Sequence, residues 1–209
     1  MIRKGVIYGI PIALGYFPVA VTFGLMALAR GMNETDVVLA SMLIFAGSAQ
    51  FALATLIDYP LNATLIPIIL NLRHLIYGCI VSRRVEVKKP FLTAFGLTDE
   101  VFALSFKGDD ERFIWGLALI AYLSWVFGTV VGVLGGSIII SNEVLYRSLV
   151  FAFPALFFVL LLSNRDWISA FIGAFVSLML MALGYPSIGI LISGLFTPFV
   201  VRWLSWRSS

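Results

Sequence analysis

Residues 61–81 read LNATLIPIILNLRHLIYGCIV, an apolar run that carries Arg73 and His74 near its centre. About 20 apolar residues in a helix are enough to cross the roughly 30 Å hydrocarbon core of a bilayer. Arg73 lies ten residues before the basic loop that starts at Arg83, and at about 1.5 Å per residue this places it roughly half-way across. A charged side chain at that depth must face protein or a wet path. The stretch therefore predicts a membrane-spanning helix with a polar role.

The composition of the whole chain also indicates lipid as its solvent. The 209 residues are 61% hydrophobic and 12% charged, with a mean hydropathy of +1.03, whereas soluble domains are about half apolar and about a quarter charged. The net charge of +3 comes mainly from basic residues in short loops, which mark membrane topology rather than a nucleic-acid surface. The single cysteine, Cys79, cannot form an internal disulfide and is typical of a small packing residue.

Seven apolar segments are long enough to be spans, so we predict an all-α, polytopic membrane protein with a single transmembrane domain over residues 1–209. The first segment follows Arg3 and Lys4 like a signal peptide, but it is too long and lacks a small-residue cleavage site, so we expect it to be retained. The predicted spans are residues 5–29, 36–57, 61–81, 112–135, 144–162, 167–183 and 186–204.

An eighth apolar segment, residues 90–106, is short and has Asp99 and Glu100 in its second half. Two charges inside a lipid-facing span would be very costly. We predict a re-entrant dip that is buried in protein, with an amphipathic surface helix as the alternative.

The Lys/Arg bias suggests an orientation. The basic loop at residues 83–89 is placed in the cytoplasm, and counting spans outward puts the N-terminus outside and the C-terminus inside. Arg3 and Lys4 conflict with this assignment. If their end is cytoplasmic, residues 5–29 must form a hairpin.

Weak internal similarity suggests an inverted 3+3 repeat. Asn33-Glu34 precedes the second span as Asn142-Glu143 precedes the fifth, and Tyr8-Gly9 and Trp115-Gly116 begin the spans before them. Inverted repeats are a common plan of transporters.

Polar residues that lie inside the predicted spans, where lipid disfavours them, are the candidates for a functional site. Asn71, His74 and Tyr77 are spaced by three and share one helix face, while Arg73 projects from another. They either line a substrate path or tie helices together. His74 is the only histidine, so a proton-relay role is a further option.

Asp99 and Glu100 are the natural partners of Arg73 and His74 if residues 90–106 dip into the membrane, because buried charges need pairing. Alternatively both carboxylates follow Thr98 as the cap of a surface helix. In the second span, Gly47 and Ser48 allow close helix approach, whereas Gln50 at mid-span needs a hydrogen-bond partner.

Two further features concern the helix backbone. Pro18 removes a helix hydrogen bond and either breaks the first span to expose carbonyls or merely kinks it; Pro154 could be the same feature in the second half. The ladder Ser124, Gly128, Gly132 and Gly136 indicates helix packing.

Five strings in order resemble the AzlC family of branched-chain amino acid permeases over about residues 5–200. They are GYFPVA (15–20), FAGSAQF (45–51), NLRHLIYG (71–78), LTDEVFAL (97–104) and FAFPALF (151–157). The resemblance implies a secondary transporter of the cytoplasmic membrane that exports valine, leucine or isoleucine, with methionine as a further candidate. It also implies that the chain is the large subunit beside a small AzlD-like membrane protein.

The polar residues are compatible with that implication. Arg73, or the N-terminus of a broken helix near Pro18 or Gly47, could hold the carboxylate of an amino acid, and Asp99, Glu100 or freed carbonyls could hold its ammonium group. The candidate substrate-binding residues are Pro18, Gly47, Ser48, Gln50, Asn71, Arg73, His74, Tyr77, Thr98, Asp99 and Glu100.

Two other functions compete with transport. The chain could be a non-transporting scaffold whose polar residues only tie helices together, or an intramembrane enzyme that uses His74 with Asp99. The sequence has no phosphate loop, nucleophile elbow, haem motif or His/Cys metal cluster. We therefore predict no metal, no cofactor and no enzymatic activity.

Overall fold

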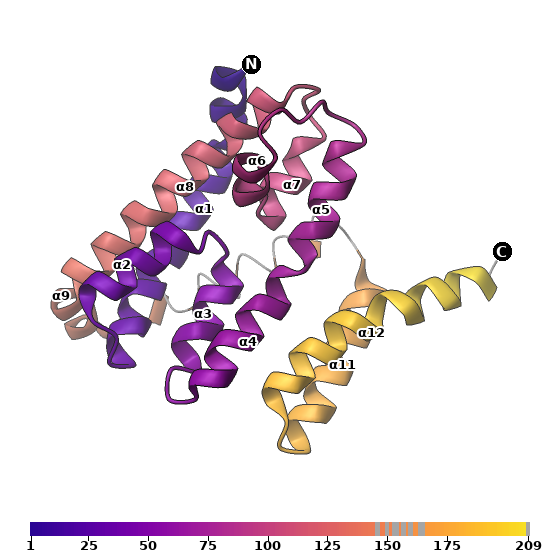
Figure 1. Cartoon of the computed structure of the whole chain (residues 1–209). Helices are drawn as coiled ribbons and strands as arrows, with labels where there is room; N and C mark the ends of the chain where they lie inside the picture. Colours follow the sequence, from indigo (N-terminus) through magenta and orange to yellow (C-terminus); the bar gives the residue numbers. More distant parts are fainter. Residues whose placement is uncertain are drawn as a thin grey trace. The chain divides into compact units, whose positions relative to one another are not determined.

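The computed structural model describes residues 1–144 and 166–207, together with residues 147, 148, 151, 155, 158, 161 and 162. The elements in these ranges are all helices, which confirms the predicted all-α membrane fold (Figure 1). Three of the described helical stretches are long and apolar enough to cross a membrane: Ile2–Ala29, Pro60–Ser82 and Glu111–Leu134. The chain forms two compact units, residues 1–153 and 154–209, and each is described by itself. The prediction of one transmembrane domain stays a prediction.

Helices α1 (Ile2–Ala29) and α8 (Glu111–Leu134) form the central pair of the first unit. They pack at backbone distance, because a Cβ on Gly5 would lie 3.0 Å from Gly116 Cα and one on Gly24 would lie 2.7 Å from Thr129 O. Contacts advance in the same direction along both helices, so the pair is parallel. The predicted small-residue ladder serves this packing: Ser124 donates to Ala13 O (2.6 Å).

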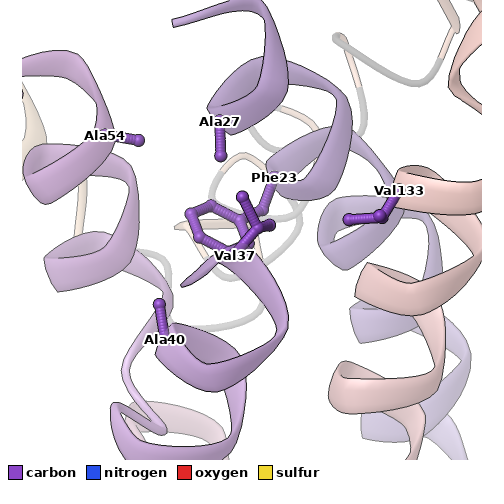
Figure 2. Close-up of a cluster of buried hydrophobic side chains, with 6 residues drawn as sticks. All are labelled: Phe23, Ala27, Val37, Ala40, Ala54 and Val133. Atoms are coloured by element: carbon purple, nitrogen blue, oxygen red, sulfur yellow. The ribbon is translucent and has the colours of Figure 1, made fainter. Parts of the chain in front are cut away.

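The segment predicted as the second span is a helical hairpin instead. It consists of α2 (Glu34–Leu43) and α3 (Gly47–Thr55), which are separated by residues 44–46. Phe23 of α1 packs in one cluster with Val37 of α2 and Ala54 of α3 (Figure 2). Both arms therefore lie at the level of Phe23, and the tip reaches Tyr16, whose ring centroid is 6.3 Å from that of Phe45. The hairpin enters and leaves at the same end.

Helices α4 (Pro60–Asn71) and α5 (Arg73–Ser82) together form the predicted third span. The α-helical hydrogen bonding is interrupted at Leu72, whose N–H bonds to Ile69 O (3.1 Å) while its carbonyl accepts from Leu75 N (3.1 Å). These shorter-range bonds tighten the helix locally. The interruption lies immediately before Arg73.

The predicted dip at residues 90–106 is a second helical hairpin, α6 (Pro90–Gly96) and α7 (Asp99–Ser105). Arg84, from the loop before it, donates to Phe106 O (2.9 Å) and pairs with Asp109 (3.1 Å), so the two ends of the hairpin lie together. The tip reaches the middle of α1, where Tyr16 lies 2.8 Å from Thr98. The alternative of a surface helix is therefore wrong.

The observed topology corrects the predicted side of the N-terminus. Because α1 and α8 are parallel and the α2–α3 hairpin does not cross, Arg3 and Lys4 lie at the same end as the basic loop at residues 83–89. The hairpin that this position of Arg3 and Lys4 predicts for residues 5–29 is wrong, because α1 is one continuous helix. The segment that forms the hairpin is the next one, α2 and α3.

The predicted inverted 3+3 repeat can be compared with this arrangement at one pair of spans. The partner that the repeat assigns to the α2–α3 hairpin is the fifth predicted span, residues 144–162, most of which lies outside the described residues. However, α1 and α8, which the sequence pairs as repeat partners, run in the same direction. The simple inverted relation of these two spans is therefore wrong.

The remaining described helices are α9 (Gly136–Ser141) in the first unit and α11 (Trp167–Ala182) and α12 (Pro186–Arg207) in the second. Helices α11 and α12 match the sixth and seventh predicted spans, and Gly184 turns between them at φ +86°. Asp166 caps α11, where hydrogen bonds from the Ser169 hydroxyl and backbone N–H hold the pKa of this carboxyl below its usual value. Most of the fifth predicted span, residues 144–162, lies outside the described residues, as does Pro154.

Candidate functional site

The tips of the two hairpins meet inside the first unit. Phe45 of the first tip lies 6.0 Å from Phe95 of α6 and 5.3 Å from Tyr122 of α8, measured between ring centroids. Discontinuous helices that meet at mid-depth leave polar backbone and short helix ends within the membrane, which proteins tolerate only where protein or a cavity surrounds them. This meeting point is therefore the natural place for a polar site.

Arg73 joins the two tips. Its Nη2 donates to Ser48 in the first turn of α3 (2.7 Å), and its Nη1 forms an ion pair with Asp99 at the start of α7 (3.0 Å). Tyr77, one turn further along α5, donates to the other oxygen of Asp99 (2.6 Å) and stacks on Phe102 with ring centroids 4.2 Å apart. The side chains of Arg73 and Asp99 remain 34% and 26% exposed, so the pair can be reached.

Two buried polar atoms beside this pair have no hydrogen-bond partner among the described residues. They are Arg73 Nε, which is a donor, and Asn71 Oδ1, which is an acceptor. Buried polar atoms are almost always hydrogen-bonded, and leaving one unpaired costs about 1–3 kcal/mol. An unpaired donor and an unpaired acceptor two residues apart suit a small ligand that carries both kinds of group.

A second polar group lies on the α1 side of α7. Tyr16, which is 5% exposed, donates a hydrogen bond to Glu100 and also lies 2.8 Å from the Thr98 hydroxyl. Thr98 caps α7 by accepting from Val101 N (3.4 Å). Thus Thr98 does cap a helix, as the alternative reading held, but this helix is inside the bundle.

Gln50 closes the first hairpin and has no exposed surface. Its amide donates to Ile44 O, and its carbonyl oxygen accepts from Trp125 Nε1 (3.0 Å) and from Ser41 (3.2 Å). Gly47 beside it leaves room for Trp125, because a Cβ there would lie 2.8 Å from the indole ring. Gln50 and Gly47 shape the tip rather than face the Arg73–Asp99 pair.

The structure thus brings together Ser48, Arg73, Tyr77, Thr98, Asp99 and Glu100 around the two tips, and Asn71 lies at the end of α4, two residues before Arg73. Pro18 lies within the continuous helix α1, so the predicted break of the first span is wrong, and the kink given as its alternative stays a prediction. The ring centroid of His74 lies 5.9 Å from that of Tyr77. Tyr16, Trp125 and Ser41 were not among the site residues predicted from the sequence.

Comparison with known proteins identifies the family. Residues 11–139, which hold every residue of this polar cluster, match the AzlC protein family. The chain belongs to the AzlC family. Residues 144–207 match a second family, described as the MJ1155 family. No solved structure matches the chain.

Relatives of this AzlC family chain are membrane proteins. An uncharacterized membrane protein of Archaeoglobus fulgidus is 47% identical over 97% of this chain and 95% of its own length. The inner membrane protein YgaZ of Escherichia coli is 30% identical over 91% of this chain and 86% of its own. The branched-chain amino acid transport protein AzlC of Bacillus subtilis is 29% identical over 78% of this chain and 67% of its own. The chain is thus a membrane protein with a role in transport.

Proposed function

We propose that this chain is the large subunit of a secondary transporter that exports branched-chain amino acids across the cytoplasmic membrane with a small AzlD-like partner. Valine, leucine and isoleucine are the proposed substrates, with methionine as a further one. The observation that carries the proposal is that Arg73 connects two re-entrant tips, while the buried donor Arg73 Nε and the buried acceptor Asn71 Oδ1 have no hydrogen-bond partner among the described residues. The amino acid class follows from the name of the Bacillus subtilis relative.

An amino acid zwitterion can replace the internal ion pair without leaving a charge uncompensated. Its carboxylate binds the Arg73 guanidinium, including Nε, and the positive end of α3 adds to the attraction. Its ammonium group binds Asp99 and donates to Asn71 Oδ1. Because removing one partner of a buried pair is far more costly than exchanging it, a solute with both charges is favoured over one with a single charge.

Binding of the zwitterion also releases the link between the hairpins. In the empty state Arg73 holds Ser48 and Asp99 together. Once the solute occupies Arg73 and Asp99, it takes the place of this direct polar link between the two tips. Movement of one hairpin past the other then opens the site to alternate sides, as expected for transporters built on discontinuous helices.

The basic end of the first unit is proposed to face the cytoplasm. Arg3, Lys4, the loop at residues 83–89, Lys107 and Arg112 lie there, whereas Arg30 lies near the opposite turns. Cytoplasmic loops carry an excess of Lys and Arg. This orientation puts both the N-terminus and the entrance of the α6–α7 hairpin inside.

Efflux of labelled valine, leucine and methionine from preloaded cells tests the proposal. The cells express the chain with its genomic neighbour, with and without a proton uncoupler. Arg73→Ala and Asp99→Asn should each lower efflux at least about tenfold, which corresponds to roughly 1.4 kcal/mol, at matched membrane expression. Lys88→Ala, which removes an exposed ion pair with Glu86, is the control and should retain efflux. Unchanged efflux in both site variants discards the site, and absence of efflux from the wild type favours a scaffold.

A further inference from the structure

Glu100 has a carboxylate that the ion pair does not use. The neighbouring Asp99 pairs with Arg73, but among the described residues no lysine, arginine or histidine forms an ion pair with Glu100. The cluster therefore contains one cation and two carboxylates at mid-depth. An ionised carboxylate without a counter-charge is costly in such surroundings, so Glu100 is a group that gains by taking up a proton when the site is empty.

The hydrogen bonds around Glu100 suit both of its protonation states. When Glu100 is ionised, Tyr16 donates to it, and the Thr98 hydroxyl can donate to the Tyr16 oxygen. When Glu100 is protonated, its O–H donates to the Tyr16 oxygen, and Tyr16 in turn donates to Thr98. Thr98 accepts from Val101 in either state. The hydrogen bonds between Glu100 and Tyr16 and between Tyr16 and Thr98 therefore reverse direction, and both are kept in both protonation states.

Most of the other titratable groups near α7 already have hydrogen-bond or ion-pair partners. Tyr16 is the one that α1 contributes. From α5, Arg73 and Tyr77 both bind Asp99, and His74 packs its ring against Tyr77. From α8, Tyr122 donates to Met42 O (3.1 Å). Glu111 and Arg112 lie in the first turn of α8, and Glu111 accepts from the backbone N–H groups of Lys88 and Lys89. Glu100 is thus the carboxylate of this cluster that can exchange a proton without breaking an ion pair among the described residues.

We propose that Glu100 is the proton-binding site that couples amino acid export to proton entry, an inference that rests on the proposed function of the Arg73–Asp99 site. The empty site carries one proton on Glu100 and returns it inward, where the proton is released to water. A bound zwitterion brings its ammonium group close to both carboxylates, which favours ionised Glu100. One proton therefore moves in for each amino acid that moves out, and by linkage substrate and proton weaken each other's binding by the same factor.

Two transport rates measured in liposomes test this coupling. The protein is reconstituted with its genomic neighbour, and exchange of labelled valine at equal pH is compared with net valine movement driven by a pH gradient. For Glu100→Gln, the ratio of pH-driven movement to exchange should fall at least about tenfold relative to wild type. The control Glu86→Gln, in the exposed basic loop, should keep the wild-type ratio.

Tyr16→Phe provides a second and independent test. It removes the charge-assisted hydrogen bond to ionised Glu100, which is stronger than the neutral bond that protonated Glu100 makes to Tyr16, so the pH of half-maximal exchange should rise by about one unit. A Glu100→Gln protein that keeps the wild-type ratio, or a Tyr16→Phe protein with an unmoved midpoint, overturns the coupling role but leaves the proposed function intact. A wild-type protein that neither exchanges nor moves valine overturns the proposed function itself.

Discussion

Gln50 illustrates how one buried polar residue determines the local path of the chain. Its amide and carbonyl bind groups on α2, in the turn at residues 44–46 and on α8 at the same time. Water is not available at this depth, so the carbonyl of Ile44 and the indole N–H of Trp125 depend on this side chain. The first hairpin tip is therefore held by side-chain hydrogen bonds as well as by packing.

Replacing Gln50 by leucine should destabilise the protein. The substitution keeps a similar volume but leaves Trp125 Nε1 and Ile44 O unpaired, and each such group costs about 1–3 kcal/mol. The midpoint of thermal unfolding of the purified protein in detergent should fall clearly. Asn62→Leu, on the exposed face of α4, is the matched control and should leave the midpoint in place. Equal midpoints for the two variants would show that Gln50 does not hold the tip.

For single residues, the sequence predicts the contacts of charged side chains better than those of aromatic side chains. The depth of Arg73 and the need to pair it were sufficient to predict Asp99 as its partner. Tyr16 and Trp125 could not be found in this way, because an aromatic ring in an apolar helix is usually a packing residue. Their polar atoms acquire a role only from groups that are 84 and 75 residues away in the chain.

At the scale of the helices, the parallel α1–α8 pair is the framework on which both hairpins lie. Its close approach depends on glycines that face each other. A Cβ on Gly116 would lie 2.9 Å from Gly5 Cα and closer still to Ile2 O. Backbone atoms cannot move away as a flexible side chain can, so added volume here separates the helices.

Gly116→Ala should therefore destabilise the pair by about 1–3 kcal/mol, as overpacking does in other cores. Gly78→Ala is the matched control, because a Cβ there meets no atom within 4 Å. Alanine also favours a helix over glycine by up to about 1 kcal/mol. Thermal unfolding in detergent should place Gly116→Ala below the wild type and Gly78→Ala at or above it. The opposite order would contradict the observed packing.

Helix length and hydropathy predicted most helices but not the first hairpin. Residues 36–57 are as long and as apolar as a true span, so hydropathy cannot distinguish the two. The turn at residues 44–46 is fixed by Gln50 and by the space that Gly47 leaves for Trp125. Both are tertiary effects. The second hairpin was predictable because Asp99 and Glu100 made a lipid-facing span too costly.

At the scale of the whole first unit, one missed hairpin reverses the predicted side of everything before it. Counting residues 36–57 as a crossing placed the N-terminus opposite the basic loop. With the hairpin in place, Arg3 and Lys4 join the other basic residues at one end, and the conflict with the positive-inside rule disappears. The charge pattern agrees with the observed topology, whereas the predicted number of membrane crossings is wrong.

Labelling of single cysteines tests this topology. In a Cys79→Ser background, cysteines placed at Lys4 and Glu86 should react with a membrane-impermeant maleimide only from the cytoplasmic side. Cysteines at Asn33 and Asp58 should react only from outside, because α1 and the α2–α3 hairpin both end there. External labelling at position 4 would contradict the parallel arrangement of α1 and α8.

The central claim is that Arg73 and Asp99, at the meeting point of two hairpin tips, bind the two charged groups of an amino acid. Competition against labelled valine exchange in liposomes tests it most directly, using valine methyl ester, which lacks the carboxylate, and 2-oxoisovalerate, which lacks the ammonium group. The account predicts that unlabelled valine competes and that both analogues compete at least about tenfold less well. Either analogue competing as well as valine would contradict it, because one of the two charges would then have no role in binding.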